Sequence, residues 1–274
     1  MKLSILASGS GGNSLYVEAE GTRLLVDAGL AHRELCRRLA RVPGAPAPES
    51  LDGVLVTHEH TDHGGHAQAL AARGLRVYAT GGTIEALELP ADCTVRIKSR
   101  KSFTIGAIQV TAVALPHDAV EPVGFVLAVG QARVGVLTDC GHPAPDVVAA
   151  YAGCSVMVLE TNHDPGMLSY GNYPPSLKRR IGGRRGHLSN EEAAEFLRAM
   201  GRPLPRVIVL AHLSQMNNRA ALARAAVGRV IGRQPTRVLV ASQSRVMAPI
   251  TVHERGVDIA TGLPGDQLPL PLPA

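Results

Sequence analysis

The sequence of 274 residues contains no tryptophan and only three phenylalanines, so its core must be built from Val, Leu, Ile and Ala. It also lacks any CxxC pair. Its four cysteines are scattered along the chain at Cys36, Cys93, Cys140 and Cys154. This spacing favours reduced thiols over a disulfide framework or a cysteine zinc site.

Long apolar runs are missing as well. The apolar stretch within residues 1–7 is too short for a signal peptide, and no run approaches the roughly 20 apolar residues of a membrane span. We therefore expect a soluble, cytoplasmic protein with no membrane partner. The loop Ala7-Ser-Gly-Ser-Gly-Gly-Asn-Ser14 lacks the Gly-Lys-Ser/Thr ending of a P-loop, which excludes nucleoside triphosphate binding by that motif.

The most informative segment that is present is Thr57-His-Glu-His-Thr-Asp-His63, which follows a short strand predicted at residues 52–56. Two histidines at i and i+2 can bind one ion from a loop, and the next Asp-His step can turn toward a second ion about 3.5–4 Å away. Imidazole and carboxylate ligands suit zinc, manganese or iron. A histidine-rich polar turn is the alternative, but the position after a strand favours a metal site.

Four further polar residues stand at the ends of apolar, β-branched runs. They are Asp27, His117, Asp139 and His212, and each is close to a turn residue. Because buried strands deliver such residues to one rim of a sheet, we expect these side chains to join the histidine segment.

This series of motifs resembles the metallo-β-lactamase superfamily over residues 27–212. The resemblance implies an α/β (α+β) fold, an αββα sandwich of two mixed β-sheets flanked by helices, within one domain of residues 1–258. It also implies two divalent metal ions. The expected ligands are His58, His60 and His117 for the first ion and Asp62, His63 and His212 for the second, with Asp139 bridging. Asp27 is expected to orient a histidine ligand.

A narrower resemblance rests on the opening Ser/Gly loop together with Leu159-Glu-Thr-Asn-His-Asp164, Gly186-His-Leu-Ser-Asn190 and Ala211-His-Leu-Ser-Gln-Met-Asn-Asn218. These segments look like the YycJ/WalJ-type metallohydrolases, from about residue 3 to about residue 245. That resemblance implies a DNA-processing, 5′-to-3′ exonuclease-like enzyme with nucleic acid as its substrate. The native metal, the choice between DNA and RNA, and the oligomeric state stay open.

Other functions of the same fold fit less well. Glyoxalase II needs a long helical domain after the last histidine, where only 62 residues follow His212. A β-lactamase would carry a signal peptide, and the β-CASP nucleases insert a whole domain between the bridging Asp and the last His. A small-molecule phosphodiesterase remains the main alternative, and a non-catalytic scaffold would require a missing ligand.

Catalysis and substrate binding need further residues. Phosphodiesterases of this fold often carry an extra histidine between the last two ligand motifs, which suggests His187 as the general acid. His163 is the second choice for this role, or a residue that supports the ligands. We expect Asp62 and Asp139 to take part in catalysis and also to bind metal. Candidate substrate contacts are Ser8, Ser10, Asn13 and Asn190.

Positive charge is concentrated between two of the ligand motifs. The chain has a net charge of +5, and residues 164–190 carry five cations against one acid. A solvated basic loop is the plain interpretation. Because the stretch lies between two ligand motifs, we expect it to be close to the metals. We therefore predict that Arg179, Arg180, Arg184 and Arg185 bind the nucleic-acid backbone.

The periodicity predicts most elements but leaves two segments without regular structure. We expect one strand over residues 103–115, a helix over about 64–73, and a helix that begins after the polar cap Ser189. Residues 164–189 are expected to be a loop, and the Pro-rich residues 259–274 a mobile tail.

Overall fold

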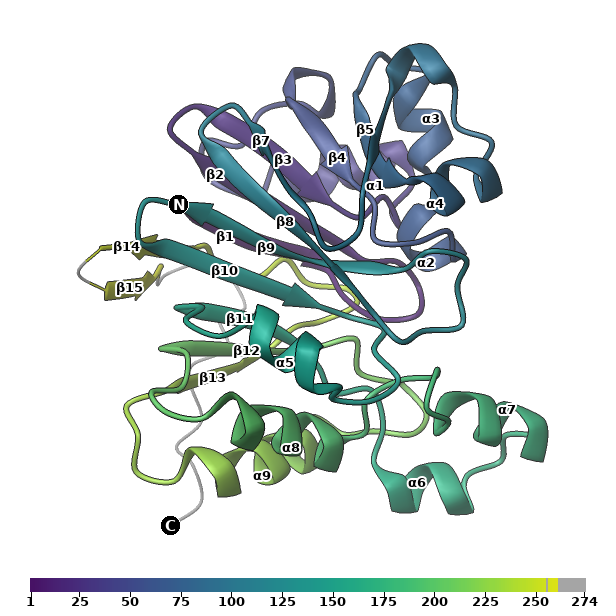
Figure 1. Ribbon diagram of the computed structural model, residues 1–274, viewed down its shortest axis with the longest axis vertical. Coiled ribbons are helices and arrows are strands. Elements are labelled where there is room, and N and C mark those ends of the chain that lie inside the picture. Colours follow the sequence, from purple (N-terminus) through teal and green to yellow (C-terminus); the bar gives the residue numbers. More distant parts are fainter. Residues whose placement is uncertain (255, 261–274) are drawn as a thin grey trace.

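Two β-sheets pack face to face, and helices cover their outer faces (Figure 1). The computed structural model describes residues 1–254 and 256–260. This arrangement is the αββα sandwich that the sequence predicted. Among the described residues, no helix combines the length and the apolar character needed to span a bilayer.

The first sheet has eight strands in the order β15-β14-β1-β2-β3-β4-β5-β6. Its N-terminal strands form antiparallel hairpins, whereas β3 to β6 run parallel to one another. The strands are β1 Lys2–Ala7, β2 Ser14–Ala19, β3 Thr22–Val26, β4 Gly53–Leu55, β5 Val77–Thr80, β6 Thr94–Ile97, β14 Ile250–His253 and β15 Gly256–Ile259.

The second sheet has seven strands in the order β13-β12-β11-β10-β9-β8-β7. Strands β10 to β13 are parallel, and the remaining pairs are antiparallel. The strands are β7 Ser102–Ile105, β8 Ile108–Ala114, β9 Val123–Val129, β10 Ala132–Leu137, β11 Val156–Glu160, β12 Val207–Ala211 and β13 Arg237–Val240.

Helices close both outer faces. On the first sheet lie α1 His32–Leu39, α3 Ala67–Ala71 and α4 Gly81–Ala86, and on the second lie α5 Pro145–Ala150, α8 Asn190–Met200 and α9 Ala220–Ile231. Two short helices, α6 Pro165–Tyr170 and α7 Pro175–Ile181, project from one end of the sandwich (Figure 1). The remaining turns are α2 Thr61–Gly64 and the 3-10 segments Pro48–Ser50 and Ala91–Cys93.

The central strands are apolar because both of their faces are buried. In β11, Val156 and Val158 pack between the sheets, while Met157 and Leu159 pack against the helices. Successive side chains of a strand point to opposite faces, so a central strand of this sandwich must be apolar at every position. Only Glu160 breaks the pattern, and it is the last residue of the strand.

Several predicted boundaries differ from the structure. The expected strand over 103–115 is a hairpin that turns at Gly106, whose φ is 53°. The expected helix over 64–73 is two pieces, α2 and α3, because the backbone leaves helical geometry at His66, whose φ is −115° and ψ is 7°. Helices α6 and α7 occupy the predicted loop. Ile259, assigned to the tail, pairs with Ile250 in the sheet, and residues 261–274 of the predicted tail lie outside the described residues.

Candidate metal centre

The predicted ligands meet where the parallel strands end. Asp27 follows β3, the histidine segment follows β4, Asp139 follows β10 and His212 follows β12. His117 comes from the loop after β8. Functional residues of α/β sheets gather outside the carboxyl ends of the strands. Here such strand ends from both sheets lie together, and we call this edge of the sandwich the rim.

Three of these residues have a left-handed backbone. The φ angles are 68° at Asp27, 57° at Asp139 and 53° at His212. For an L-residue with a Cβ this conformation costs roughly 1–2 kcal/mol. Strain of this kind gathers at functional sites, where the rest of the structure holds the residue in place.

One group of imidazoles forms the first half of the site. His58, His60 and His117 bring one ligand atom each within 4.8 Å of one another. Nδ1 of His60 lies 3.3 Å from Nε2 of His117, and the rings of His58 and His60 are 4.7 Å apart. His58 and His117 are buried, so these rings are held by packing.

The second half combines imidazoles with carboxylates. Asp62, His63 and His212 form another group within 4.8 Å, and Nε2 of His212 lies 3.2 Å from Oδ2 of Asp62. Asp139 lies between the halves. Its carboxylate is 2.6 Å from Nε2 of His63 and 3.4 Å from Nδ1 of His212, and it shares a third group with His58 and His63.

Two buried atoms indicate that this cluster fits metal ions. Nε2 of His58 and Oδ2 of Asp139 have no hydrogen-bond partner among the described residues. The short contact between Asp139 and His63 lacks hydrogen-bond geometry. An unsatisfied buried polar atom costs about 1–3 kcal/mol, and a cation would satisfy both atoms.

Charges within the cluster shift the pKa values strongly. Burial raises the pKa of Asp139, but the imidazoles of His212 and His63 outweigh burial and hold it well below its usual range. Burial lowers the pKa of His63, and the carboxylates of Asp139 and Asp27 reverse this and raise it well above its usual value. A bound cation would replace the proton on such a histidine, since metal ligands must be deprotonated.

Neighbouring groups fix the orientation of the ligands. Oδ2 of Asp27 lies 2.7 Å from Nδ1 of His63, in the position predicted for an orienting carboxylate. The carbonyl oxygen of Gly186 lies 2.9 Å from Nδ1 of His117. The side-chain amide of Asn13 donates to the backbone and carboxylate oxygens of Asp62. Contacts of this kind set the tautomer of a ligand and its direction.

Glu160 is a site residue that the sequence did not reveal. It is completely buried, and its Oε1 lies 2.9 Å from Nδ1 of His187 and 3.1 Å from Nδ1 of His212. Its Oε2 accepts backbone N–H groups of Cys140 and Leu188. Burial raises the pKa of Glu160, but His187 and His212 outweigh it and lower the pKa to about 2. The available signal was an acid ending an otherwise apolar strand.

His187 joins the rim at the edge of the cluster. Its Nδ1 lies 2.9 Å from carboxylate oxygens of both Glu160 and Asp139, and its side chain is 20% exposed. Burial lowers the pKa of His187, but Glu160 and Asp139 outweigh it and raise the pKa to about 10. His163 is buried and does not line the pocket that His187 lines, which argues against His163 as a proton donor.

A pocket of about 390 Å³ opens over this cluster. Asp62, Asp139, His187 and His212 line its floor, and Tyr173, Leu177 and Arg180 come from the predicted basic stretch. The stretch between Asp139 and His212 therefore forms part of the pocket, with α7 beside the rim (Figure 1).

Three predicted substrate contacts have other partners. The hydroxyl of Ser8 accepts the backbone N–H of His212, and Asn13 supports Asp62. The buried amide of Asn190 exchanges two 2.9 Å hydrogen bonds with Asn218. The polar atoms of these three side chains hold the loops together, and their contact with substrate stays a prediction. Ser10 does line the pocket.

The four arginines of the basic stretch fall into two groups, those with an internal partner and those without an ion pair. Arg180 pairs with Asp118, and Arg185 donates two hydrogen bonds to the carbonyl oxygen of His117. Within the described residues, the exposed guanidinium groups of Arg179 and Arg184 make no ion pair. These two cations therefore have no internal ion pair to break before they meet an anionic substrate, whereas Arg180, which lines the pocket, does.

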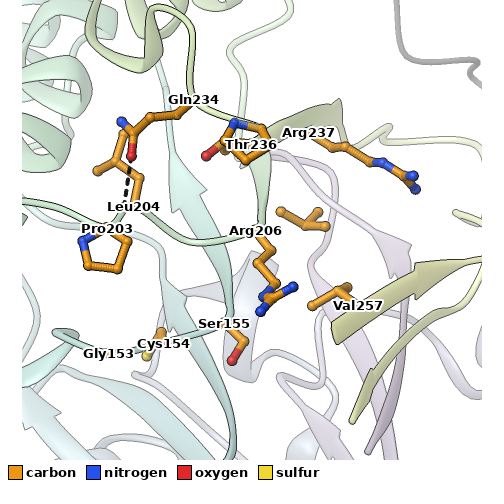
Figure 2. Close-up of a pocket in the computed structure, with 12 residues that line it drawn as sticks. Gly153, Cys154, Ser155, Pro203, Leu204, Arg206, Gln234, Thr236, Arg237 and Val257 are labelled. Atoms are coloured by element: carbon orange, nitrogen blue, oxygen red, sulfur yellow. Dashed lines mark hydrogen bonds between the residues drawn. The ribbon is translucent and has the colours of Figure 1, made fainter. Parts of the chain in front are cut away.

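A second cleft, which we call the far cleft, lies at the opposite ends of β11, β12 and β13 (Figure 2). It measures about 550 Å³ and is lined by Arg206, Gln234 and Arg237 among others. None of its described lining residues is a carboxylate or an imidazole. The candidate metal-ligand groups found among the described residues all lie at the rim.

Comparison with known proteins agrees with this site. Residues 22–213 match the profile of the β-lactamase superfamily domain. The chain belongs to this superfamily. It is 36% identical to the exodeoxyribonuclease YycJ of Bacillus anthracis over 84% of this chain and 89% of that protein. It is 37% identical to the exodeoxyribonuclease WalJ of Streptococcus pneumoniae over 81% and 85% of the two chains. The predicted resemblance to the YycJ/WalJ family is confirmed.

Solved structures of the superfamily share its fold. The metallo-β-lactamase fold protein YhfI from Bacillus subtilis aligns with a TM-score of 0.69 at 19% identity, over 89% of this chain and 98% of its own. Zn²⁺-bound PqqB from Methylobacterium extorquens aligns with a TM-score of 0.66 at 19% identity, over 90% and 99%. At this identity the comparison supports the architecture alone.

Proposed function

We propose that this member of the superfamily is a dinuclear-metal phosphodiester hydrolase that degrades DNA, as a 5′-to-3′ exonuclease-like nuclease. The observation that carries the proposal is the buried cluster of histidines and carboxylates with its two unsatisfied atoms. Similarity to two exodeoxyribonucleases over more than four-fifths of this chain supports DNA as the substrate.

We infer two ion positions within the four overlapping groups of candidate ligands. His58, His60 and His117 would hold one ion, Asp62, His63 and His212 the other, and Asp139 would contact both. Zinc, manganese or iron would suit these ligands. When bound, such a pair lowers the pKa of water and neutralises charge on the phosphate.

His187 is our candidate for the group that protonates the leaving oxygen. Glu160 and Asp139 contact its Nδ1, so Nε2 is the nitrogen left to donate a proton to substrate. In the metal-free protein Glu160 and Asp139 raise the pKa of His187, which favours the protonated ring that a proton donor needs. General acid catalysis of this kind contributes typically about 10²–10⁴-fold.

The test combines metal analysis with cleavage. We expect two metal ions per chain and cleavage of both a 5′-labelled duplex and a 5′-labelled single strand from the 5′ end. Fully active protein with one metal ion or none would overturn the dinuclear proposal. Metal-loaded protein that cleaves neither DNA would overturn the nuclease proposal.

A small-molecule phosphodiesterase is the second candidate. The internal partners of Arg180 and Arg185 favour it, because they reduce the charge available to a long DNA backbone. It predicts faster turnover of a small phosphodiester than of any oligonucleotide.

A further inference from the structure

The few aromatic side chains of this protein are distributed unevenly. It has five tyrosines and three phenylalanines. Five are buried and a sixth packs on the core: Tyr16, Tyr78, Tyr151, Phe125 and Phe196, with Phe103 stacked on Tyr78. The other two, Tyr170 and Tyr173, lie three residues apart where α6 meets α7.

The two tyrosines differ in their position relative to the metal centre. Tyr173 lines the pocket over the cluster. Tyr170 is 91% exposed, and its Cα lies at most about 11 Å from that of Tyr173, since consecutive Cα atoms are 3.8 Å apart.

The junction between α6 and α7 is held against the loop that follows His212. The N–H of Asp164 donates to the carbonyl oxygen of Asn217, and a side chain at Gly171 would lie 2.7 Å from Oδ1 of Asn217. The junction that carries the two tyrosines is therefore tied to the loop after His212.

Exposed aromatic rings beside exposed cations are typical of grooves for single-stranded nucleic acid. A lone exposed tyrosine needs no explanation. Here one ring lines the pocket and a second, exposed ring lies three residues before it, in a chain with 3% aromatic residues. The exposed Arg179 follows on α7. In such grooves bases stack on the rings while cations follow the phosphates.

We propose that Tyr173 and Tyr170 stack against unpaired bases next to the phosphodiester that is cut. The enzyme would then act on a single-stranded or frayed DNA end, because bases within a duplex are stacked on one another and offer no free face. This inference rests on the proposed nuclease function and adds the form of DNA that the site accepts.

The test compares bases with backbone. We would measure the affinity of the metal-loaded protein for a phosphorothioate-linked single-stranded oligothymidylate and for an abasic oligonucleotide of equal length. Tyr173→Ala and Tyr170→Ala should each weaken oligothymidylate binding by about tenfold, because each variant loses one ring on which a base can stack. Binding of the abasic strand should not change.

Two controls separate stacking from other effects. Tyr173→Phe and Tyr170→Phe keep the ring and should bind like wild type. Leu222→Ala removes a 38% exposed apolar side chain from α9 and should have no effect. Unchanged oligothymidylate affinity in both Ala variants, or equal losses for the two strands, would overturn the stacking proposal. A wild-type protein that binds neither strand would instead overturn the nuclease function on which the proposal rests.

Discussion

At both ends of the second sheet the chain adopts positive φ angles next to the strands, but different residue types occupy these positions at the two ends. At the end that carries the far cleft, left-handed turns before β11, β12 and β13 are made by Gly153, Gly201 and Gly232. At the rim, the left-handed positions after β10 and β12 are Asp139 and His212. Glycine adopts this conformation without steric cost, whereas the other residues are strained.

The difference separates turns that only reverse the chain from turns that present a ligand. A Cβ at Gly153, Gly201 or Gly232 would meet no atom within 4 Å, so only the backbone conformation favours glycine there. At the rim, the carboxylate of Asp139 and the imidazole of His212 are needed, and the strain is retained. Four predictions test this contrast, from the largest expected effect to the smallest.

The largest effect is expected at Asp139. Asp139→Ala should abolish DNA cleavage and lower the metal content, because it removes the carboxylate that joins both halves of the site. Asp139→Gly lacks the same carboxylate but relieves the strain. Its free energy of unfolding in the metal-free state should exceed that of Asp139→Ala by about 1 kcal/mol. Equal stability of the two variants would show that the left-handed conformation is not strained, and retained activity would remove Asp139 from the site.

The second prediction concerns the proton donor at the rim. His187→Ala should lower turnover of DNA about 10²–10⁴-fold while the metal content stays unchanged. A nitrophenyl phosphodiester should be much less affected, because nitrophenolate leaves without a proton. Glu160→Gln should give a smaller loss in the same direction, since it removes the carboxylate that holds Nδ1 of His187. Equal losses on both substrates would make His187 a ligand or a positioning residue.

The candidate metal ligands at the rim could be predicted from the sequence, whereas the residues and helices around them could not. The histidine segment is local, and each remaining ligand follows an apolar run, so periodicity and residue type were sufficient. Glu160 was missed because one acid at the end of a buried strand has no local pattern around it. Helices α6 and α7 have only six and seven residues, too short for a clear apolar period, and both begin with proline. The partners of Arg180 and Arg185 come from distant segments, so charge counting could not distinguish them from Arg179 and Arg184.

The third prediction compares arginines at the two ends. Replacing Arg179 and Arg184 by Ala should raise the Michaelis constant for DNA and flatten the salt dependence of binding, by about 0.9 in log–log slope for each phosphate that the variant no longer neutralises. Replacing Arg206 and Arg237 at the far cleft removes the same charge and should leave the slope unchanged. Binding titrations at several salt concentrations measure both. Equal slopes for wild type and both double variants would exclude a DNA groove at α7.

The smallest effect is expected at the turn before β11. Gly153→Ala should lower the free energy of unfolding by about 1 kcal/mol, because alanine is strained at a φ of 76°. Gly153→Asn is the matched control and should lose less, since asparagine tolerates this conformation better. Both variants should keep their metal content and their rate of DNA cleavage, because Gly153 lines the far cleft and not the rim. Urea denaturation of the three proteins, with activity measured on the same samples, tests the contrast. A loss of activity in a variant that is still folded would mean that the two ends of the sheet are coupled. The conclusion that the glycine turns contribute to stability alone would then be wrong.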